Sequence, residues 1–268
     1  MAFSRSWMLC GLTLIACGSL LLYQEGCRPN APRVANAAEP AEGGGAPKVD
    51  AAAAAREVAE KNALVKAGGW KSLFDGKTLT GWKAPDFGGQ GKVYVKDGAI
   101  VLEMGSSMTG VTWTGPLIRD NYELELEGIR YDGSDFFCTT TFPVGDDSCS
   151  FVVGGWGGML VGLSNVDFED ASNNLTMKTI AFKENQWYKV RIRVSEGAIE
   201  TWIDDQQVVN QPRDGHKFSV RFEVDLCRPL GVSTWCTKGA VRNIRIRPLK
   251  PEEIQAAREK AKAAAAAE

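Results

Sequence analysis

The chain has 268 residues, of which 44% are apolar and 24% charged, and this ordinary globular composition is enough to bury a large core. Its 31 basic and 33 acidic residues leave a formal net charge of −2 without a basic cluster, which excludes a strongly basic nucleic-acid-binding protein. The single histidine, His216, excludes a zinc site with three histidines and restricts any nucleophile–histidine pair to that residue.

The first segment, residues 1–27, has the features of an export signal. Arg5 precedes an apolar run over residues 7–23, the order that is typical of such signals. Three alternatives remain open. The four residues that end at Cys17 resemble a lipobox, in which Cys17 would be acylated; the apolar run also approaches the length of a membrane anchor; and plain secretion would cleave near Gly26. Together these alternatives predict an exported bacterial protein that is periplasmic, anchored to the cell envelope or secreted.

Both flanks of the central region have low complexity. Residues 28–67 are predicted to be a linker. From 28 to about 55 the chain is rich in Pro, Ala, Gly and Glu and lacks large apolar side chains, so we expect a flexible tether, followed by a short helix over 52–67 with a thin apolar side. Residues 250–268 are rich in Glu, Lys and Ala and have almost no apolar face. They predict a solvated helical tail that begins at Pro251.

Residues 68–249 form one predicted domain of short strands. Residues 122–127 alternate strictly, which places Tyr122, Leu124 and Leu126 on one face and three carboxylates on the other. Asp97-Gly98 between two apolar runs predicts a hairpin over 93–102. Further strands are predicted at 151–153, 159–163, 177–181, 218–224, 232–236 and 241–247. The pattern predicts an all-β fold, a two-sheet antiparallel jelly-roll sandwich.

A second hairpin, over residues 187–205, is predicted in register. If Glu196-Gly197 is the turn, Val194 lies opposite Ile199, and two opposite-charge pairs and one cation–aromatic pair align on the other face. A slip of one residue would destroy all three. The pairs are Arg193 with Glu200, Lys189 with Asp204 and Arg191 with Trp202.

Four cysteines lie in this domain, and export permits disulfides. If residues 145–147 form a turn, Cys149 lies opposite Pro143, and Cys138 lies further along and faces the other side. This geometry argues against a Cys138–Cys149 bridge, and a milder form of the argument applies to Cys227 and Cys236. The pairing stays open, with buried free thiols as the alternative.

Several motifs resemble the 3-keto-disaccharide hydrolase family. The sequence WKSLFDGKTLTGW at residues 70–82 resembles its opening motif, and 95–100, 185–208 and 241–249 resemble its second hairpin, a later hairpin and its closing strand, in the same order. The resemblance implies a concanavalin A-like, laminin-G-like jelly roll and hydrolysis of glycosides oxidised at C3 of the sugar.

The central motifs depart from that family. Its Gly-Asn-Ser-Gly strand corresponds here to GSDFFCTTT at residues 133–141, and its Tyr-Glu-x-Gln strand to 159–167, of which only the terminal Asp167 is kept. A His-Gly near the end of the family pattern is absent. The chain is therefore identified as a divergent member, in which the scaffold motifs match and the central motifs mostly do not.

Carboxylates are the candidate catalytic groups, because glycoside cleavage with one histidine would need an acidic pair. A 3-keto sugar also permits elimination by a base and an oxyanion stabiliser. The loop around Asp167 and Asp170 is dense in oxygen ligands, which suit catalysis or Ca²⁺, although such loops are usually turns. Asp135 is the third candidate, because it lies where the family has its signature strand.

Candidate ligand-binding residues come from three other segments. Trp156 lies among four glycines, which predicts either a platform for a sugar ring or a bulge with Trp156 in the core. Trp235 is a weaker candidate of the same kind. Arg228, before Pro229, could bind an anionic or keto oxygen, and His216 is expected to be exposed and inert.

The sequence therefore predicts an exported carbohydrate-active protein, with glycoside hydrolysis of 3-keto-disaccharides or 3-keto-glucosides as the leading hypothesis. A non-catalytic carbohydrate-binding module and a structural envelope protein are the alternatives. The expected partner is a carbohydrate and not a nucleic acid. An enzyme predicts that Asp135, Asp167 or Asp170 converge in one pocket, whereas a binding module predicts an aromatic platform without them.

Overall fold

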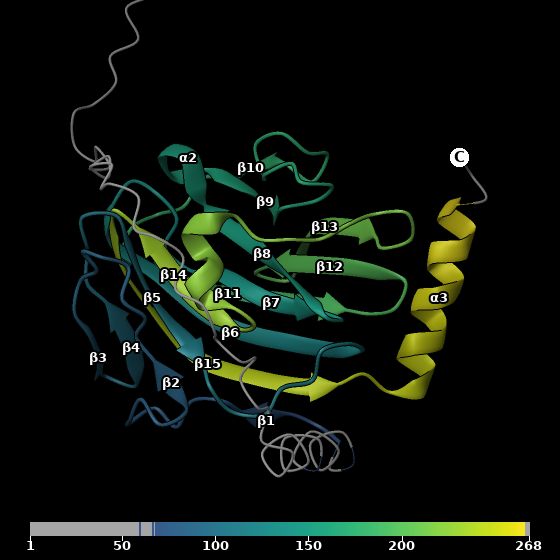
Figure 1. The fold of residues 1–268 in the computed structure, drawn as a ribbon, viewed down its shortest axis with the longest axis horizontal. Coiled ribbons are helices and arrows are strands. Elements are labelled where there is room, and N and C mark those ends of the chain that lie inside the picture. Colours follow the sequence, from purple (N-terminus) through teal and green to yellow (C-terminus); the bar gives the residue numbers. More distant parts are fainter. Residues whose placement is uncertain (1–58, 60–65, 67, 266–268) are drawn as a thin grey trace, which may run out of the picture. The chain divides into compact units, whose positions relative to one another are not determined.

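The computed structural model describes Ala59, Lys66 and residues 68–265. Two antiparallel sheets, one of eight strands and one of seven, form the central domain (Figure 1). This confirms the predicted all-β, two-sheet antiparallel jelly-roll sandwich. Cys17 and the rest of the predicted signal segment lie outside the described residues, as does nearly all of the predicted linker.

The eight-stranded sheet has the strand order β13-β12-β11-β6-β15-β4-β3, and β1 pairs with β15. Its strands are β1 (Lys71–Ser72), β3 (Val93–Lys96), β4 (Ala99–Leu102), β6 (Tyr122–Gly133), β11 (Trp187–Val194), β12 (Ala198–Ile203), β13 (Gln206–Pro212) and β15 (Thr237–Pro248).

The seven-stranded sheet has the order β10-β9-β8-β7-β14-β5-β2. Its strands are β2 (Trp82–Lys83), β5 (Met108–Trp113), β7 (Thr139–Val144), β8 (Asp147–Gly154), β9 (Leu160–Ser164), β10 (Lys178–Thr179) and β14 (Gly231–Trp235). The described helical segments are α2 (Gly155–Gly158), the 3₁₀ helix η1 (Phe222–Cys227) and α3 (Pro251–Ala265). No helix in the described part of the chain is long and apolar enough to cross a membrane.

The core lies between the two sheets and follows from strand alternation. Tyr122, Leu124 and Leu126 point into it from β6, as their spacing predicts, and Phe151 meets them from β8. Each of these four side chains is completely buried. The residues between them in sequence point outward, so each sheet presents a separate polar face.

The opening motif at residues 70–82 is part of the scaffold. Leu73 is buried in the core, and the indole Nε1 of Trp82 donates to the Leu73 carbonyl at 2.8 Å. Asp75 closes the turn between them by accepting hydrogen bonds from the backbone N–H groups of Thr78 and Lys77. These bonds lower the pKa of Asp75 to about 2. The motif therefore fixes the first turn and one corner of the core.

The hairpin of β11 and β12 has the predicted register: Val194 lies opposite Ile199, Arg193 opposite Glu200 and Arg191 opposite Trp202. The Arg191 guanidinium lies 4.0 Å from the centre of the Trp202 ring. The predicted Lys189–Asp204 pair differs in detail. Lys189 Nζ forms its ion pairs with Glu125 at 3.3 Å and with Asp205 at 3.6 Å, while Asp204 accepts from the Lys189 backbone N–H.

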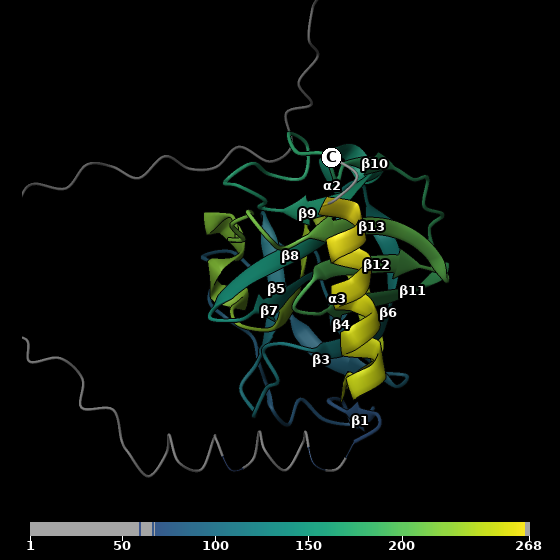
Figure 2. The same ribbon diagram turned by 90° about the vertical axis from the view of Figure 1, so that its right-hand side faces the viewer.

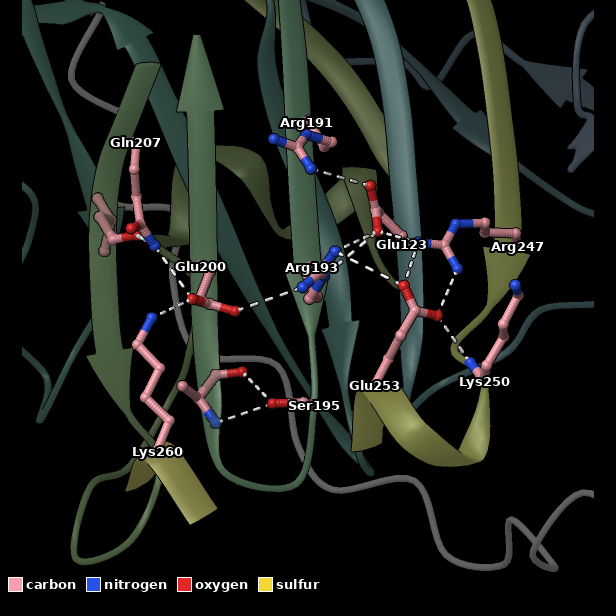
Figure 3. Close-up of polar contacts among 12 residues, drawn as sticks. Glu123, Arg191, Arg193, Ser195, Glu200, Gln207, Arg247, Lys250, Glu253 and Lys260 are labelled. Atoms are coloured by element: carbon pink, nitrogen blue, oxygen red, sulfur yellow. Dashed lines mark hydrogen bonds and ion pairs between the residues drawn. The ribbon is translucent and has the colours of Figure 1, made fainter. Parts of the chain in front are cut away.

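The three outward carboxylates of β6 lie between two basic strands. Arg193 of β11 and Arg247 of β15 flank Glu123, with their guanidinium groups 3.0 and 2.5 Å from its carboxylate (Figure 3). Glu125 and Glu127 are paired in the same way, each with an arginine of β15. Because an acidic row between two basic rows compensates every charge, this face of the sheet tolerates burial of Glu123 to 3% exposure.

The predicted C-terminal helix is present as α3 and begins at Pro251, as expected, and ion pairs hold it beside this charged face while its described side chains stay exposed or half-buried. Figure 2 shows α3 in front of β11, β12 and β13. Glu253 accepts from Arg247 at 2.7 Å, and Lys260 Nζ lies 2.7 Å from Glu200. An apolar face is the feature that predicts such a contact from sequence, and this helix has almost none. Ion pairs hold it in place instead.

Two predicted strands are wrong or shortened. Residues 218–224 contain an isolated bridge at Phe218 and then enter η1, and residues 177–181 reduce to the two residues of β10. Residues 222–224 of the first segment belong to η1, which packs against β5 and β14 of the seven-stranded sheet. This difference moves Arg221 and Glu223 from a strand face to the wall of a pocket.

The strand register accounts for the absence of a Cys138–Cys149 disulfide. Cys149 lies opposite Phe142, so the predicted register with Pro143 is wrong by one residue. Cys138 and Cys149 therefore both face the core, but about 13 Å of strand separates Cys138 from the partner position of Cys149. Cys138, Cys149 and Cys227 are free and buried within the described residues. Burial raises the pKa of Cys149 to about 12, so this thiol is unreactive.

Candidate functional site

A pocket with a volume of about 260 Å³ opens on the outer face of the seven-stranded sheet. Its floor consists of the side chains that alternate with the core residues of five strands, and its walls come from η1 with the residue before it, the α2 turn and the loop before β7. The floor residues are Met108, Thr139, Ser150, Val152, Ser164 and Trp235, and the wall residues are Asp135, Phe136, Trp156, Arg221, Glu223 and Val224.

The floor of the pocket carries hydroxyl groups. Thr139, Ser150 and Ser164 are nearly fully buried. Ser150 Oγ lies 2.9 Å from Thr141 Oγ1, and Ser164 Oγ donates to Asn165 Oδ1 at 3.1 Å. Thr139 Oγ1 has no hydrogen-bond partner in the described part of the chain. The Thr139 hydroxyl is therefore enclosed by the floor, and the indole rings of Trp156 and Trp235 add apolar surface to the pocket.

Asp135 is the carboxylate that the loop before β7 places in the wall. Its Oδ1 accepts from the Phe136 backbone N–H at 2.7 Å and its Oδ2 accepts from the Gly157 backbone N–H at 3.4 Å. Burial raises the pKa of Asp135, and hydrogen bonds from backbone N–H groups together with the charge of Arg130 offset only part of this effect. A carboxyl with a raised pKa in a pocket has the chemistry of a proton acceptor or donor.

Trp156 enters the pocket from a glycine-rich turn with a left-handed backbone. Gly154, Gly157 and Gly158 all have positive φ, and Trp156 itself is left-handed with φ 46°. A Cβ at Gly158 would lie 2.8 Å from Arg130 Nη1 and 3.1 Å from the Ser134 carbonyl oxygen. The Trp156 side chain is 45% exposed, so the ring belongs to the pocket and not to the core.

Arg221 connects three segments that border the pocket. Its Nε and Nη2 grip the carboxylate of Glu223 at 3.1 and 2.7 Å, and its Nη1 donates to Asp170 Oδ2 at 2.5 Å. The same guanidinium lies 5.7 Å from the centre of the Trp156 ring. Segments around β9, η1 and α2 therefore meet at one side chain.

The structure brings three of the six predicted catalytic and ligand-binding residues together, because Asp135, Trp156 and Trp235 line one pocket. Asp170 lies beside it through Arg221. Burial raises the pKa of Asp170, but hydrogen bonds from Ser172 and the charge of Arg221 outweigh burial, and the net result is a lowered pKa.

Asp167 and Arg228 do not line the pocket. Asp167 accepts from the Lys217 backbone N–H, and its other oxygen lies 2.6 Å from His216 Nδ1. The bond from Lys217, followed by the bond from His216, lowers the pKa of Asp167. His216 is exposed, as expected. Arg228 pairs with Asp225 at 3.3 Å on the surface of η1.

The two expected Ca²⁺ ligands, Asp167 and Asp170, share no hydrogen-bond donor. Asp167 and Asp170 each use both carboxylate oxygens on different protein donors. Over the described residues, no group of three or more His, Cys, Asp or Glu side chains could hold a metal ion. These residues therefore do not fit a shared cation site in this conformation.

Two residues of the site escaped the sequence analysis. Arg221 and Glu223 lie in the segment that predicts a strand, where their spacing would place them on one polar face. That spacing was the one available signal. It could not show that the chain would fold into η1 and turn both side chains toward Trp156.

Comparison with known proteins adds a family and a fold. Residues 69–247 match a family model described as "3-keto-alpha-glucoside-1,2-lyase-like domain". No curated protein sequence matches the chain. Among solved structures, the Crh5 transglycosylase in complex with NAG has a TM-score of 0.50 and 14% identity over 70% of this chain and 86% of its own.

Two further structures are similar at lower scores. The carbohydrate-binding module CBM66 from Bacillus subtilis has a TM-score of 0.43 and 11% identity over 62% of this chain and 95% of its own. Domain 4 of AbnA, a GH43 extracellular arabinanase from Geobacillus stearothermophilus solved with arabinotriose, has a TM-score of 0.41 and 14% identity over 66% of this chain and 87% of its own. At such identities the likeness to the transglycosylase concerns the fold alone.

Proposed function

Because the chain belongs to the family of 3-keto-alpha-glucoside-1,2-lyase-like domains, we propose that it cleaves glycosides whose sugar carries a ketone at C3. The observation that carries the proposal is the convergence of Asp135, Trp156 and Trp235 in one pocket with a hydroxyl-lined floor. These residues come from three separate segments of the chain. The family match supports a carbohydrate substrate, and the pocket contains a carboxylate and two indole rings that could act on it.

The proposed reaction begins at C2 of the sugar. The C3 ketone acidifies the C2–H bond, and the Asp135 carboxylate takes that proton while the electron pair moves to form an enolate at the C3 oxygen. The enolate then re-forms the ketone, a C1=C2 double bond appears, and the C1–O bond to the aglycone breaks. The proton from C2 passes to the aglycone oxygen. Addition of water across the double bond completes a hydrolysis.

The other pocket residues bind and orient the sugar. Trp156, on the wall, and Trp235, on the floor, offer aromatic surface against which the C–H face of a pyranose packs. The Asp135 carboxylate is held by the backbone N–H groups of Phe136 and Gly157, so little reorganisation is needed when it accepts a proton.

The test is release of p-nitrophenol from p-nitrophenyl 3-keto-α-glucoside by the full chain. We expect Asp135→Asn to lower the rate by about 10²–10⁴-fold, because an amide cannot accept the proton. Only ionised Asp135 acts as a base, so the wild-type rate should rise with pH through a pKa that burial raises above the usual value of an aspartate.

The matched control for this test is Asp132→Asn, which removes an exposed carboxylate of β6 and should leave the rate unchanged. Unaltered release by Asp135→Asn would contradict the proposal. A parallel assay with EDTA examines the expected Ca²⁺: a rate that EDTA abolishes and Ca²⁺ restores would add a metal to the site.

A non-catalytic saccharide-binding module is the second candidate. It is favoured by Trp156, a residue that is 45% exposed and lines the pocket. Binding of the 3-keto-glucoside by the wild-type chain without any release of p-nitrophenol, together with loss of binding in Trp156→Ala, would select this candidate over the enzyme.

We also propose that the chain is exported and acts outside the cytoplasm, either anchored or released. The basic residue and apolar run of residues 5–23 support this proposal. Fractionation of the expressing bacterium should find the protein outside the cytoplasm, and Cys17→Ser should release it from the membrane if Cys17 carries a lipid. Recovery of full-length protein in the cytoplasm would contradict export.

A further inference from the structure

The charges around the pocket are unequal in number. Asp135 and Glu223 line the pocket, and Arg221 is the one basic side chain among the described residues that does so. A third carboxylate, Asp170, bonds to Arg221 from the loop after β9. Two carboxylates, Glu223 and Asp170, therefore bond to the single guanidinium, and a third, Asp135, lines the same pocket.

The positive charge of Arg221 is already compensated. Its Nη2 and Nε donate to the two oxygens of Glu223, and its Nη1 donates to Asp170. The hydrogen bond to Glu223 is the largest cause of the raised pKa of Arg221. A ligand carboxylate that approached Arg221 would have to displace one of these partners or lie close to both.

The neighbouring cations do not change this balance. Arg130 lies behind the glycine turn, is 8% exposed, and donates to the carbonyl oxygens of Gly158 and Phe182. It does not line the pocket. If Arg130 is counted with Arg221, the three carboxylates still outnumber the two guanidinium groups. Arg228, which is paired with Asp225, does not line the pocket either.

We propose that the site accepts sugars with uncharged substituents and rejects acidic sugars, such as uronates or sugars that carry sulfate or phosphate, a selectivity that rests on the proposed function. An ionised substituent would lose its hydration on entry and would meet carboxylates without a free cation. A hydroxyl or amide of the same size carries no charge and would not meet this repulsion.

The proposed reaction does not add a negative charge to the site. When Asp135 takes the proton from C2, its negative charge passes to the enolate oxygen of the substrate. The net charge of the site is unchanged during this step, because one anion is neutralised as another forms. An acidic substituent differs because it adds a charge that no step removes. The site can therefore stabilise an enolate and still reject a uronate.

The test compares three p-nitrophenyl 3-keto-α-glycosides with the full chain. The first is the glucoside; the second is the uronate, with a carboxylate at C6; the third is the uronamide, which has nearly the size of the uronate without its charge. Binding is measured by calorimetry and cleavage by p-nitrophenol release. We expect the uronate to bind at least tenfold more weakly than the uronamide, and the uronamide to bind within a few fold of the glucoside.

A charge variant then locates the cause of the selectivity. Asp170→Asn removes one carboxylate from Arg221 and keeps an oxygen for Ser172, so the ratio of uronamide to uronate affinity should shrink at least threefold. Asp225→Asn makes the same change on the exposed side of η1 and should keep the wild-type ratio. If Asp170→Asn fails to fold, as judged by its melting curve, Glu223→Gln replaces it with the same expectation.

The outcomes separate the two proposals. Equal binding of the uronate and the uronamide overturns the selectivity and leaves the proposed reaction intact. Tight binding of the uncharged sugars without cleavage overturns the proposed reaction, and the affinity ratio still decides the selectivity. If none of the three sugars binds, the site takes no such sugar and both proposals fall.

Discussion

Trp156 reaches the pocket because neighbouring glycines permit a backbone that other residues resist. Gly157 and Gly158 both have positive φ, yet their surroundings differ: a Cβ at Gly157 would meet nothing within 4 Å, whereas one at Gly158 would meet Arg130 and Ser134. The two positions therefore separate the cost of backbone strain from the cost of crowding. Crowding at Gly158 would displace Arg130 and shift the turn that carries Trp156.

We expect Gly158→Ala to destabilise the fold by about 2 kcal/mol more than Gly157→Ala, since both substitutions strain the backbone but only one adds a clash. Gly158→Ala should also weaken sugar binding, because the turn must move. Denaturant unfolding measures the first effect and calorimetry the second. Equal stability of the two variants would show that the turn relaxes without cost.

Helix α3 illustrates docking of an element by charge. Pro251 occupies its first turn, and Glu253 accepts the Lys250 backbone N–H at 2.8 Å, which is the arrangement of a capped helix start. Glu253 also joins the helix to Arg247, as Figure 3 shows. Further along, a Cβ at Gly197 would lie 2.8 Å from the Ala257 carbonyl oxygen, so the helix rests closely on the β11–β12 turn.

The contribution of Glu253 should depend on pH. Its hydrogen bonds with Arg247, which outweigh the opposite effect of burial, lower its pKa from 4.5 to about 2. Because the pKa in the folded protein is depressed, the stabilisation is fully present above pH 4.5 and is lost as the pH falls toward about 2. We expect Glu253→Gln to lower Tm by about 2–4 °C at neutral pH. The difference from wild type should disappear at the acidic end of that range.

A suitable control for the pH series is Glu259→Gln, whose carboxylate accepts only from Gln255 on the exposed side of α3. This variant should follow the wild-type melting curve at every pH. A Glu253→Gln effect that persists unchanged near pH 2 would show that the glutamate acts through packing and not through its charge.

At the scale of the whole molecule, the two outer faces of the sandwich have different chemistry. The outer face of the eight-stranded sheet carries compensated rows of charge, such as Glu123 between Arg193 and Arg247, and supports α3. The outer face of the seven-stranded sheet carries hydroxyl groups and a pocket. The fold thus separates an electrostatic, structural face from a face that can receive a ligand, and the shared core keeps both in place.

Much of the scaffold was predictable because it depends on local pattern. The strict alternation of residues 122–127 gave the inward row Tyr122, Leu124 and Leu126, and the charge pairs of the β11–β12 hairpin gave its register. The opening motif gave the family. Within the site, Asp135, Trp156 and Trp235 were predicted individually, from unusual neighbours and from the resemblance.

The sequence by itself determined the strand faces, the hairpin register, the family and the jelly-roll class, because each depends on residues within a short stretch of chain. Only the tertiary structure decided which candidates share a pocket. Arg221 contacts Asp170 and Trp156, residues about 50 and 65 positions away in the chain. Such contacts depend on how the loops fold over the sheet, and no local period encodes them. The same reason applies to α3, because its Lys260 pairs with Glu200 of β12, 60 positions away in the chain.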